Sequence, residues 1–195
     1  MLNFRGAKFI KSATSKLDRP EKKLKEVLFV GRSNVGKSSL INALVDNKSL
    51  CFTSSKPGHT RLLNYFEIKD SCYLVDAPGY GYSKAGHQHD ENFAKMMEDY
   101  FSDNNELSLV VFLIDSRREV REEEMDLFNL FNADHIPYVI VLTKCDKLNQ
   151  SEKAKAIKEI NTSLSHVDKS NILFTSIDDK KSIESLQKYI ANAIK

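Results

Sequence analysis

Short runs of consecutive apolar residues alternate with amphipathic stretches along most of the chain. Continuous apolar runs are typical of strands that are buried on both faces, whereas apolar residues at a period near 3.6 predict helices. We therefore predict strands at residues 27–30, 62–68, 71–75, 107–114, 137–142 and 171–174. Helices are predicted to start at Ser38 and to cover residues 91–101, 122–131, 151–164 and 182–194.

The order of these elements predicts the architecture. The strands at 62–68 and 71–75 are joined by a short turn at Lys69 and Asp70, which predicts an antiparallel hairpin. After the hairpin, strands and helices alternate, which favours a parallel sheet with helices on both faces. We predict an α/β fold with three αβα layers and a mostly parallel six-stranded sheet carrying one antiparallel edge strand. In such folds, function lies at the carboxyl ends of the strands.

Length and charge limit the organisation of the chain. A chain of 195 residues, 41% of them hydrophobic, suffices for one well-buried α/β domain, so we predict a single domain over residues 1–195. Residues 1–26 carry eight Lys and Arg against three Asp and Glu, residues 27–143 eleven against seventeen, and residues 144–195 ten against seven. The first 24 or so residues lack a sustained hydrophobic period, and we interpret them as a partly ordered basic arm.

Neither the apolar runs nor the cysteines indicate export. No run is long enough to span a membrane, and residues 1–5 lack the apolar core of a signal peptide, so we expect a cytoplasmic protein without membrane contact. Cys51, Cys72 and Cys145 are odd in number and lack metal-ligand spacing. They are expected to be reduced thiols.

Residues 31–38 read Gly-Arg-Ser-Asn-Val-Gly-Lys-Ser. The two glycines allow backbone amides to wrap around an oligophosphate, Lys37 adds a point charge for the outer phosphates, and Ser38 offers a hydroxyl to Mg²⁺. The predicted strand before this segment and the helix after it are the context that the motif requires, and the start of that helix favours an anion. The segment therefore predicts a phosphate-binding loop in a P-loop NTPase, small-GTPase-like fold.

Asp76-Ala77-Pro78-Gly79 directly follows the strand at 71–75. It would place a carboxylate near the magnesium ion and a glycine amide near a terminal phosphate. The same four residues also form a good turn, so the prediction depends on the phosphate loop that accompanies them. Thr60, in a polar loop, could complete the magnesium shell when a third phosphate is present, although such a threonine is usually just solvated.

Thr143-Lys144-Cys145-Asp146 follows another buried strand and suggests selection of guanine. One Asp carboxylate can accept both the ring N–H and the exocyclic amine of guanine, whereas adenine would leave the anion without a partner. The stem of Lys144 can cover the flat base while its ammonium stays hydrated. Phe174-Thr175-Ser176 could hold the base from its other side through backbone amides, a prediction based on position alone.

In this order and spacing, the segments resemble a translation-factor-type GTPase, and more closely the EngB (YihA, YsxC) family of bacterial ribosome-assembly GTPases, within the TrmE-Era-EngA-YihA-Septin-like group. The resemblance covers about residues 4–194. Its specific parts are Gly31 to Asn42, Pro57-Gly58 with Thr60, Asn64 and Phe66, Asp76 to Tyr82, Asp115 with Arg117, and Thr143 to Asp146. The chain departs from the family at Thr175, where a serine is usual, and at Ser182, where a glycine is expected.

The resemblance implies a slow, magnesium-dependent GTPase that acts as a switch in large ribosomal subunit assembly, with a family-linked role in cell division and septation. The expected catalytic residues are Lys37, Thr60, Asp76 and Gly79, and Ser38 and Thr60 are the expected metal ligands. Contacts with GTP or GDP are expected from Gly31, Arg32, Ser33, Asn34, Val35, Gly36, Lys37, Ser38, Ser39, Gly58, His59, Thr60, Arg61, Leu62, Asp76, Ala77, Pro78, Gly79, Thr143, Lys144, Cys145, Asp146, Phe174, Thr175 and Ser176. The expected partners are the rRNA and proteins of the large subunit, and the protein is expected to be a monomer.

Three further expectations follow. Tyr80 stands where Ras-like GTPases place a water-orienting glutamine, so unassisted hydrolysis should be slow. Asn34 could help to hold K⁺, as an asparagine does at this position in related GTPases, or could simply tolerate a left-handed backbone.

Once GTP orders the two loops, they are expected to present a surface that suits RNA, formed by Tyr80, Tyr82, Lys84, Lys56 and Arg61. The basic arm could add electrostatic attraction to the RNA.

Two other functions stay open on the sequence alone. A P-loop ATPase or nucleoside kinase is disfavoured because a kinase lid would be rich in Arg, whereas the region after Asp76 is rich in Tyr and Gly. A nucleotide-gated binding module with negligible hydrolysis needs the same pocket as a GTPase, so the sequence does not separate these two.

Overall fold

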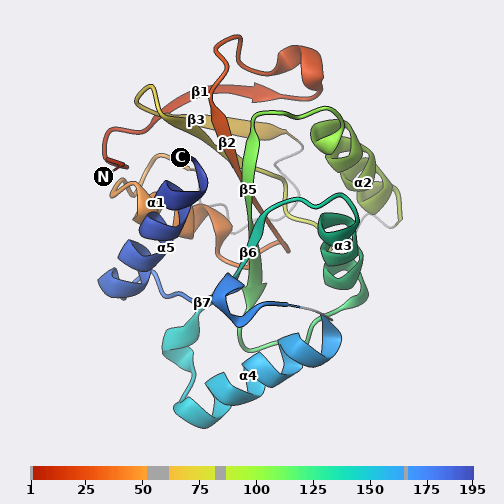
Figure 1. The fold of residues 1–195 in the computed structure, drawn as a ribbon, viewed down its shortest axis with the longest axis vertical. Helices are drawn as coiled ribbons and strands as arrows, with labels where there is room; N and C mark the ends of the chain where they lie inside the picture. Colours follow the sequence, from red (N-terminus) through yellow and green to blue (C-terminus); the bar gives the residue numbers. More distant parts are fainter. Residues whose placement is uncertain (1, 52–61, 82–86, 165–166) are drawn as a thin grey trace.

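A seven-stranded sheet forms the middle layer of the molecule, in the order β1-β3-β4-β2-β5-β6-β7 (Figure 1). This computed structural model describes residues 2–51, 62–81, 87–164 and 167–195. The strands are β1 Lys8–Ala13, β2 Lys25–Gly31, β3 Leu63–Ile68, β4 Cys72–Asp76, β5 Leu107–Asp115, β6 Tyr138–Thr143 and β7 Ile172–Phe174. The helices are α1 Lys37–Leu44, α2 His87–Phe101, α3 Glu122–Ala133, α4 Gln150–Ser163 and α5 Lys180–Ala193, with 3₁₀ turns η1 Lys16–Asp18, η2 Cys145–Lys147 and η3 Lys169–Asn171.

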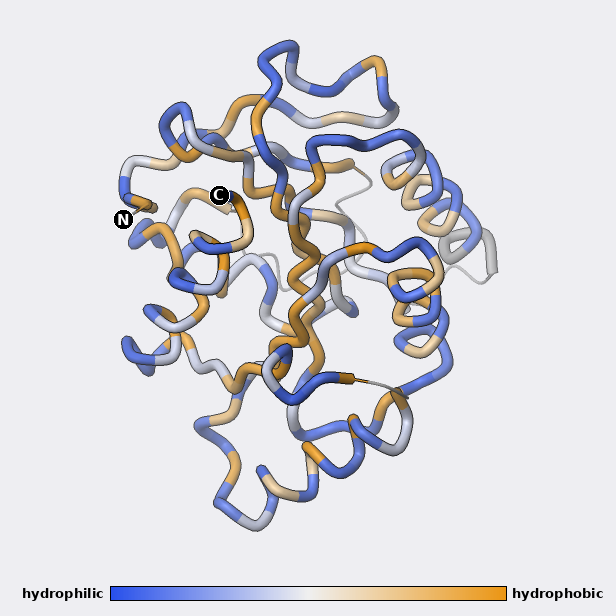
Figure 2. Tube along the Cα trace, in the orientation of Figure 1, coloured by the Kyte–Doolittle hydropathy of each residue, from blue (hydrophilic) through white to orange (hydrophobic). Residues whose placement is uncertain are grey.

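The central strands are apolar on both faces because helices cover both. Along β2, Val27 and Phe29 point into one core and Leu28 and Val30 into the other, and all four side chains are fully buried. This alternation follows from the two-residue period of a strand. The continuous apolar runs of the sequence therefore supply two cores at once, which appear as the hydrophobic centre in Figure 2.

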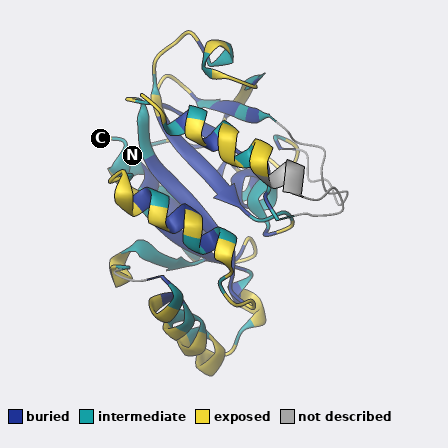
Figure 3. Cartoon of the chain, turned by 90° about the vertical axis from the view of Figure 1, so that its right-hand side faces the viewer, coloured by how far each residue is buried: buried dark blue, intermediate teal, exposed yellow. Residues whose placement is uncertain are grey.

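Helices α1 and α5 cover one face of the sheet, and α2, α3 and α4 cover the other (Figure 1). The helices that face the viewer in Figure 3 bury one stripe and expose the opposite one, whereas no residue of α1 is exposed. The inward residues of α5 are Ile183, Leu186 and Ile190, and those of α3 are Leu127, Phe128 and Phe131. The two chain ends lie near each other on the side of α1 and α5 (Figures 1 and 3).

The predicted fold class is confirmed, with one more strand than predicted. Residues 8–13, within the predicted basic arm, form β1 and pair antiparallel with β3. Consequently β1 is the edge strand, and β3, which is the strand that runs against the others, lies second from the edge. The pattern did not predict β1 because Phe9 and Ile10 are exposed, at 52% and 40%, so the strand shows no buried alternation.

Cys51, Cys72 and Cys145 are buried free thiols, and burial raises the pKa of each of them. Across the part of the chain that the structure describes, no helix is both long enough and apolar enough to cross a membrane.

Candidate functional site

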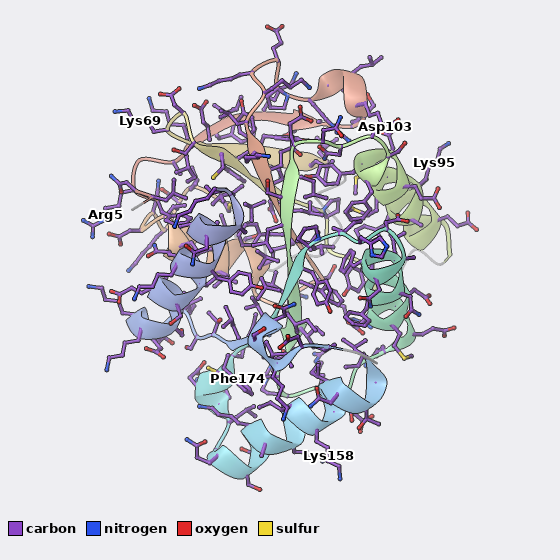
Figure 4. All side chains as sticks on the ribbon, in the orientation of Figure 1. Arg5, Lys69, Lys95, Asp103, Lys158 and Phe174 are labelled. Atoms are coloured by element: carbon purple, nitrogen blue, oxygen red, sulfur yellow. The ribbon has the colours of Figure 1, made fainter. Side chains whose placement is uncertain are left out.

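The segments predicted to carry chemistry meet at one edge of the sheet. The phosphate loop follows β2, and the segments beginning at Asp76, Thr143 and Phe174 stand at the carboxyl ends of β4, β6 and β7. These strands are parallel to one another and occupy the contiguous part of the sheet from β4 to β7. Figure 4 shows Phe174 at this end and Lys69 at the opposite end.

The phosphate loop has the backbone conformation that its glycine spacing predicts. Gly36 is the N-cap of α1 with φ of 105°, a left-handed value that L-residues rarely adopt, and Asn34 also has a positive φ, of 65°. The N-cap makes no side-chain capping bond. Since the first amides of a helix have no partner within the helix, they are available to an anion at this point.

Lys37 and Asp76 form an ion pair across the site. Lys37 begins α1, and Asp76 ends β4, the strand next to β2. Their side chains are only 10% and 7% exposed, so each charge offsets the desolvation cost of burying the other. The sequence predicted both residues at the phosphates and magnesium, but it did not predict this direct contact.

Ser33 connects the phosphate loop to the segment after β4. Its amide donates to the Tyr80 carbonyl at 2.9 Å, and its hydroxyl donates to the Gly79 carbonyl at 3.2 Å. A Cβ on Gly79 would lie 2.8 Å from the Ser33 Cα, so this close approach requires glycine. The two loops that would flank a terminal phosphate are therefore in direct contact.

The side chain of Tyr80 is buried in the core. Its ring is 2% exposed and packs 5.3 Å from the ring of Phe93, and its hydroxyl donates to Glu124 Oε1 at 3.4 Å. Burial and the neighbouring Glu124 carboxylate raise the pKa of Tyr80, so the phenol stays protonated. The prediction that Tyr80 contributes an aromatic face to an RNA surface is wrong for this structure, because packing against α2 and α3 buries the ring.

The turn after β6 is tied to the phosphate loop. The Thr143 hydroxyl donates to the Val35 carbonyl at 2.8 Å, and the Lys144 ammonium donates to the Asn34 carbonyl at 2.9 Å. Asp146 lies at the exposed end of this turn, where hydrogen bonds from Lys147 and Ser176 lower the pKa of its carboxyl. Asp146 is therefore an ionised acceptor facing solvent at the edge of the site.

Thr175 and Ser176 are buried directly beside this turn. The Thr175 carbonyl accepts from the Cys145 amide at 3.4 Å. Ser182 holds the segment from α5, because its hydroxyl accepts from the Ser176 amide at 3.1 Å and lies within donating distance of the Asp179 and Ser176 carbonyls, at 2.8 and 3.1 Å. The sequence marked Ser182 only as a departure from the family, and its hydroxyl is a loop anchor that a glycine could not supply.

Several predicted site residues lie outside the described residues. From the predicted nucleotide contacts these are Gly58, His59, Thr60 and Arg61, and from the expected RNA surface they are Lys56, Arg61, Tyr82 and Lys84. Leu62 is described and half-buried. The remaining predicted residues all lie along the edge formed by β4, β2, β6 and β7.

The comparisons with known proteins agree with this arrangement. The family model of the 50S ribosome-binding GTPase matches residues 26–144. A probable GTP-binding protein EngB of Desulforapulum autotrophicum is 48% identical over 168 residues, which cover 86% of this chain and 87% of that protein. The chain belongs to the EngB family. It is thus a P-loop GTPase that binds and hydrolyses GTP, and the alternative of an ATPase or nucleoside kinase is excluded.

Solved structures support the fold of this EngB-family GTPase. The crystal structure of a probable GTP-binding protein engB aligns with a TM-score of 0.71 at 24% identity, covering 87% of this chain and 98% of that one. Era of Aquifex aeolicus bound to GDP·AlF₄⁻ aligns with a TM-score of 0.66 at 26% identity, covering 89% of this chain and 58% of that one.

Proposed function

We propose that this EngB-family GTPase is a slow molecular switch for assembly of the large ribosomal subunit, with a family-linked role in cell division and septation. The observation that carries the proposal is the meeting of the phosphate loop, Asp76–Gly79 and Thr143–Asp146 at one sheet edge in a chain of this family. The protein would act in the cytoplasm as a monomer.

Residues of the phosphate loop would hold the di- or triphosphate. Backbone amides at the start of α1 would surround it, and Lys37 would move from Asp76 to the outer phosphates. Gly79 packs directly against Ser33 of this loop, where its amide would lie beside a terminal phosphate. Gly58 to Leu62 would complete the enclosure from the opposite loop.

The donor set fits magnesium. Ser38 presents a hydroxyl in the first turn of α1, and the carboxylate of Asp76 stands at the end of β4. One hydroxyl and one carboxylate suit Mg²⁺, which keeps several waters and takes few protein ligands besides phosphates. Ser38 and Thr60 would hold the ion, which when bound neutralises charge between the last two phosphates.

The guanine base would lie between two loops. Asp146 would accept from its N1–H and exocyclic amine, and the stem of Lys144 would cover one face. Phe174, Thr175 and Ser176 would contact its other side, with Cys145 beneath the turn. The Ser176 amide now bonds to Ser182, so that bond would have to be shared with a base oxygen or released for this contact.

The position of Tyr80 supports slow unassisted hydrolysis. Its phenol is held at Glu124 and its ring is buried against Phe93, so in this conformation it would not orient a water molecule at the terminal phosphate. No equivalent of the water-orienting glutamine stands at residue 80, so rapid turnover requires a group from a partner. The large ribosomal subunit would supply or order that group.

The switch predicts that nucleotide controls binding to the ribosomal subunit. The protein is expected to co-sediment with purified large subunits more strongly with a non-hydrolysable GTP analogue than with GDP, because only a third phosphate engages Thr60 and Gly79 together. Binding should fall at least about tenfold between 50 and 200 mM salt if three or more rRNA phosphates are contacted. Equal pelleting in both nucleotide states would exclude the switch, and small subunits provide the control.

The exposed side chain of Asn34 is proposed to hold K⁺ during hydrolysis. GTP turnover is then expected to be about tenfold or more faster in K⁺ than in Na⁺ at equal ionic strength, because the ion would stabilise developing charge. Asn34→Ser should remove the difference. Asn34→Gly is the matched control, since glycine keeps the left-handed backbone but has no amide oxygen. Equal rates in both salts, with full activity of both variants, would show that Asn34 serves only the backbone.

A further inference from the structure

Asp115 is a buried carboxylate at the centre of the site, and it has no part in the proposed binding of phosphate, magnesium or base. It ends β5, between the phosphate loop after β2 and the turn after β6, and its side chain is only 7% exposed. A charge in this position needs compensation. Four contacts provide it, from Arg117 and Lys144.

Arg117 fixes the carboxylate from the solvent side. Its amide donates to Asp115 Oδ1 at 3.1 Å, its Nε to Oδ1 at 2.9 Å and its Nη2 to Oδ2 at 2.8 Å. Burial by itself raises the pKa of Asp115, but the hydrogen bonds from Arg117 and Lys144 outweigh it and hold the pKa well below the usual range. Asp115 is thus a fixed, fully ionised anion at neutral pH.

Lys144 reaches this anion from the turn after β6. Its backbone is left-handed, with φ of 60° and ψ of 30°, and its Nζ lies 2.9 Å from both Asp115 Oδ2 and the Asn34 carbonyl oxygen. A free lysine side chain has many rotamers, and holding it in one arrangement has an entropic cost. Here the two acceptors hold the ammonium across the phosphate loop within the protein itself.

We propose that Asp115 is a positioning residue for nucleotide binding, which fixes Lys144 across the phosphate loop and so joins base recognition to phosphate recognition. The inference rests on the proposed role of Lys144 in covering the base. Asp115 itself does not touch the nucleotide in this account. By holding the Lys144 stem in place before the base binds, it reduces the entropic cost of nucleotide binding.

Asp115→Asn tests the proposal, because asparagine keeps the size of the side chain and removes its charge. Dissociation of fluorescent GDP and GTP is expected to accelerate about 10- to 100-fold, the range for loss of one charged hydrogen bond. Preference for guanine over adenine should remain, since Asp146 is unchanged. Asp126→Asn makes the same chemical change at an exposed position on α3 and should leave dissociation within about twofold of the wild type.

A double-mutant cycle with Lys144→Met shows whether Asp115 acts through the lysine. Methionine keeps an apolar stem and removes the ammonium. In the Lys144→Met background, Asp115→Asn is expected to change GDP dissociation less than about twofold, because the partner it positions is already absent. Effects that multiply in the double variant would overturn the proposal.

Failure of the inference can be told apart from failure of the proposed function. If Lys144→Ala, which removes the stem, leaves dissociation unchanged, the role of Lys144 at the base is wrong, and the inference falls with it. If Lys144→Ala accelerates dissociation and Asp115→Asn does not, only the inference is wrong.

Should Asp115→Asn not fold, as judged by circular dichroism, the wild-type protein provides a second measurement. A ¹⁵N-detected Lys144 ammonium signal, assigned by its loss in Lys144→Met, is expected to be protected from solvent exchange without added nucleotide. A freely exchanging Lys144 ammonium would overturn the proposal.

Discussion

Lys37→Met is expected to lower the affinity for GTP and GDP about 10²- to 10⁴-fold, because each charged hydrogen bond to a phosphate contributes about 1.5–3 kcal/mol and the ammonium would make two. The same change should destabilise the nucleotide-free protein. Lys37 and Asp76 are a nearly buried pair, and removing one member of such a pair typically costs about 3–5 kcal/mol. Equilibrium titration with fluorescent nucleotides and urea unfolding would measure the two effects.

A second substitution separates these effects. In Lys37→Met, the carboxylate of Asp76 is buried without a partner, and adding Asp76→Asn removes that charge. The Lys37→Met/Asp76→Asn double variant should therefore recover much of the free energy of unfolding, while its nucleotide affinity stays low. Nucleotide binding within about threefold of the wild type in Lys37→Met would contradict the assignment of Lys37 to the phosphates. Unchanged stability of Lys37→Met would show that the ion pair does not contribute to folding.

Asp146→Asn is expected to change the base that the protein prefers. The carboxylate offers two acceptors, whereas an amide offers one donor and one acceptor, which suits xanthine because its oxygen replaces the exocyclic amine of guanine. GTP affinity should fall about 10²- to 10³-fold, and xanthosine triphosphate should gain a similar factor. Competition of the two nucleotides against fluorescent GDP in wild type and variant would measure both values.

The location of Asp146 makes this a clean test. Its side chain is 31% exposed and its ion pair is with the neighbouring Lys147, so the substitution should change stability little. Asp134→Asn, at an exposed position after α3, is the matched control and should bind GTP as the wild type does. If Asp146→Asn binds GTP normally, the turn after β6 does not select the base.

Most of the fold could be predicted from the sequence because its elements carry strong local signals. The apolar runs of β2, β4, β5 and β6 and the amphipathic periods of α3, α4 and α5 all appear close to their predicted bounds. In contrast, β1 depends on pairing with β3, and its exposed Phe9 and Ile10 give no such signal. An edge strand that buries little is visible only once its neighbour is in place.

Much of the candidate site could also be located from sequence, but its internal contacts could not. Tyr80 was placed on a surface because it lies in a predicted loop with Tyr82 and Lys84, and packing against Phe93 and Glu124 buries it instead. Ser182 seemed a simple loss of glycine, and its hydroxyl accepts a hydrogen bond from the Ser176 amide. Each of these outcomes depends on an element far along the chain.

The sequence by itself determined which backbone and side-chain groups occupy the ends of the strands. The glycine spacing of residues 31–36, the carboxylate after β4 and the Lys144–Asp146 turn are local features, set by residues adjacent in the chain. Tertiary structure alone decided which of these groups meet. The order β4-β2-β5-β6 brings Asp76 to Lys37 and Asp115 to Lys144, because strands distant in sequence become neighbours only when the sheet forms.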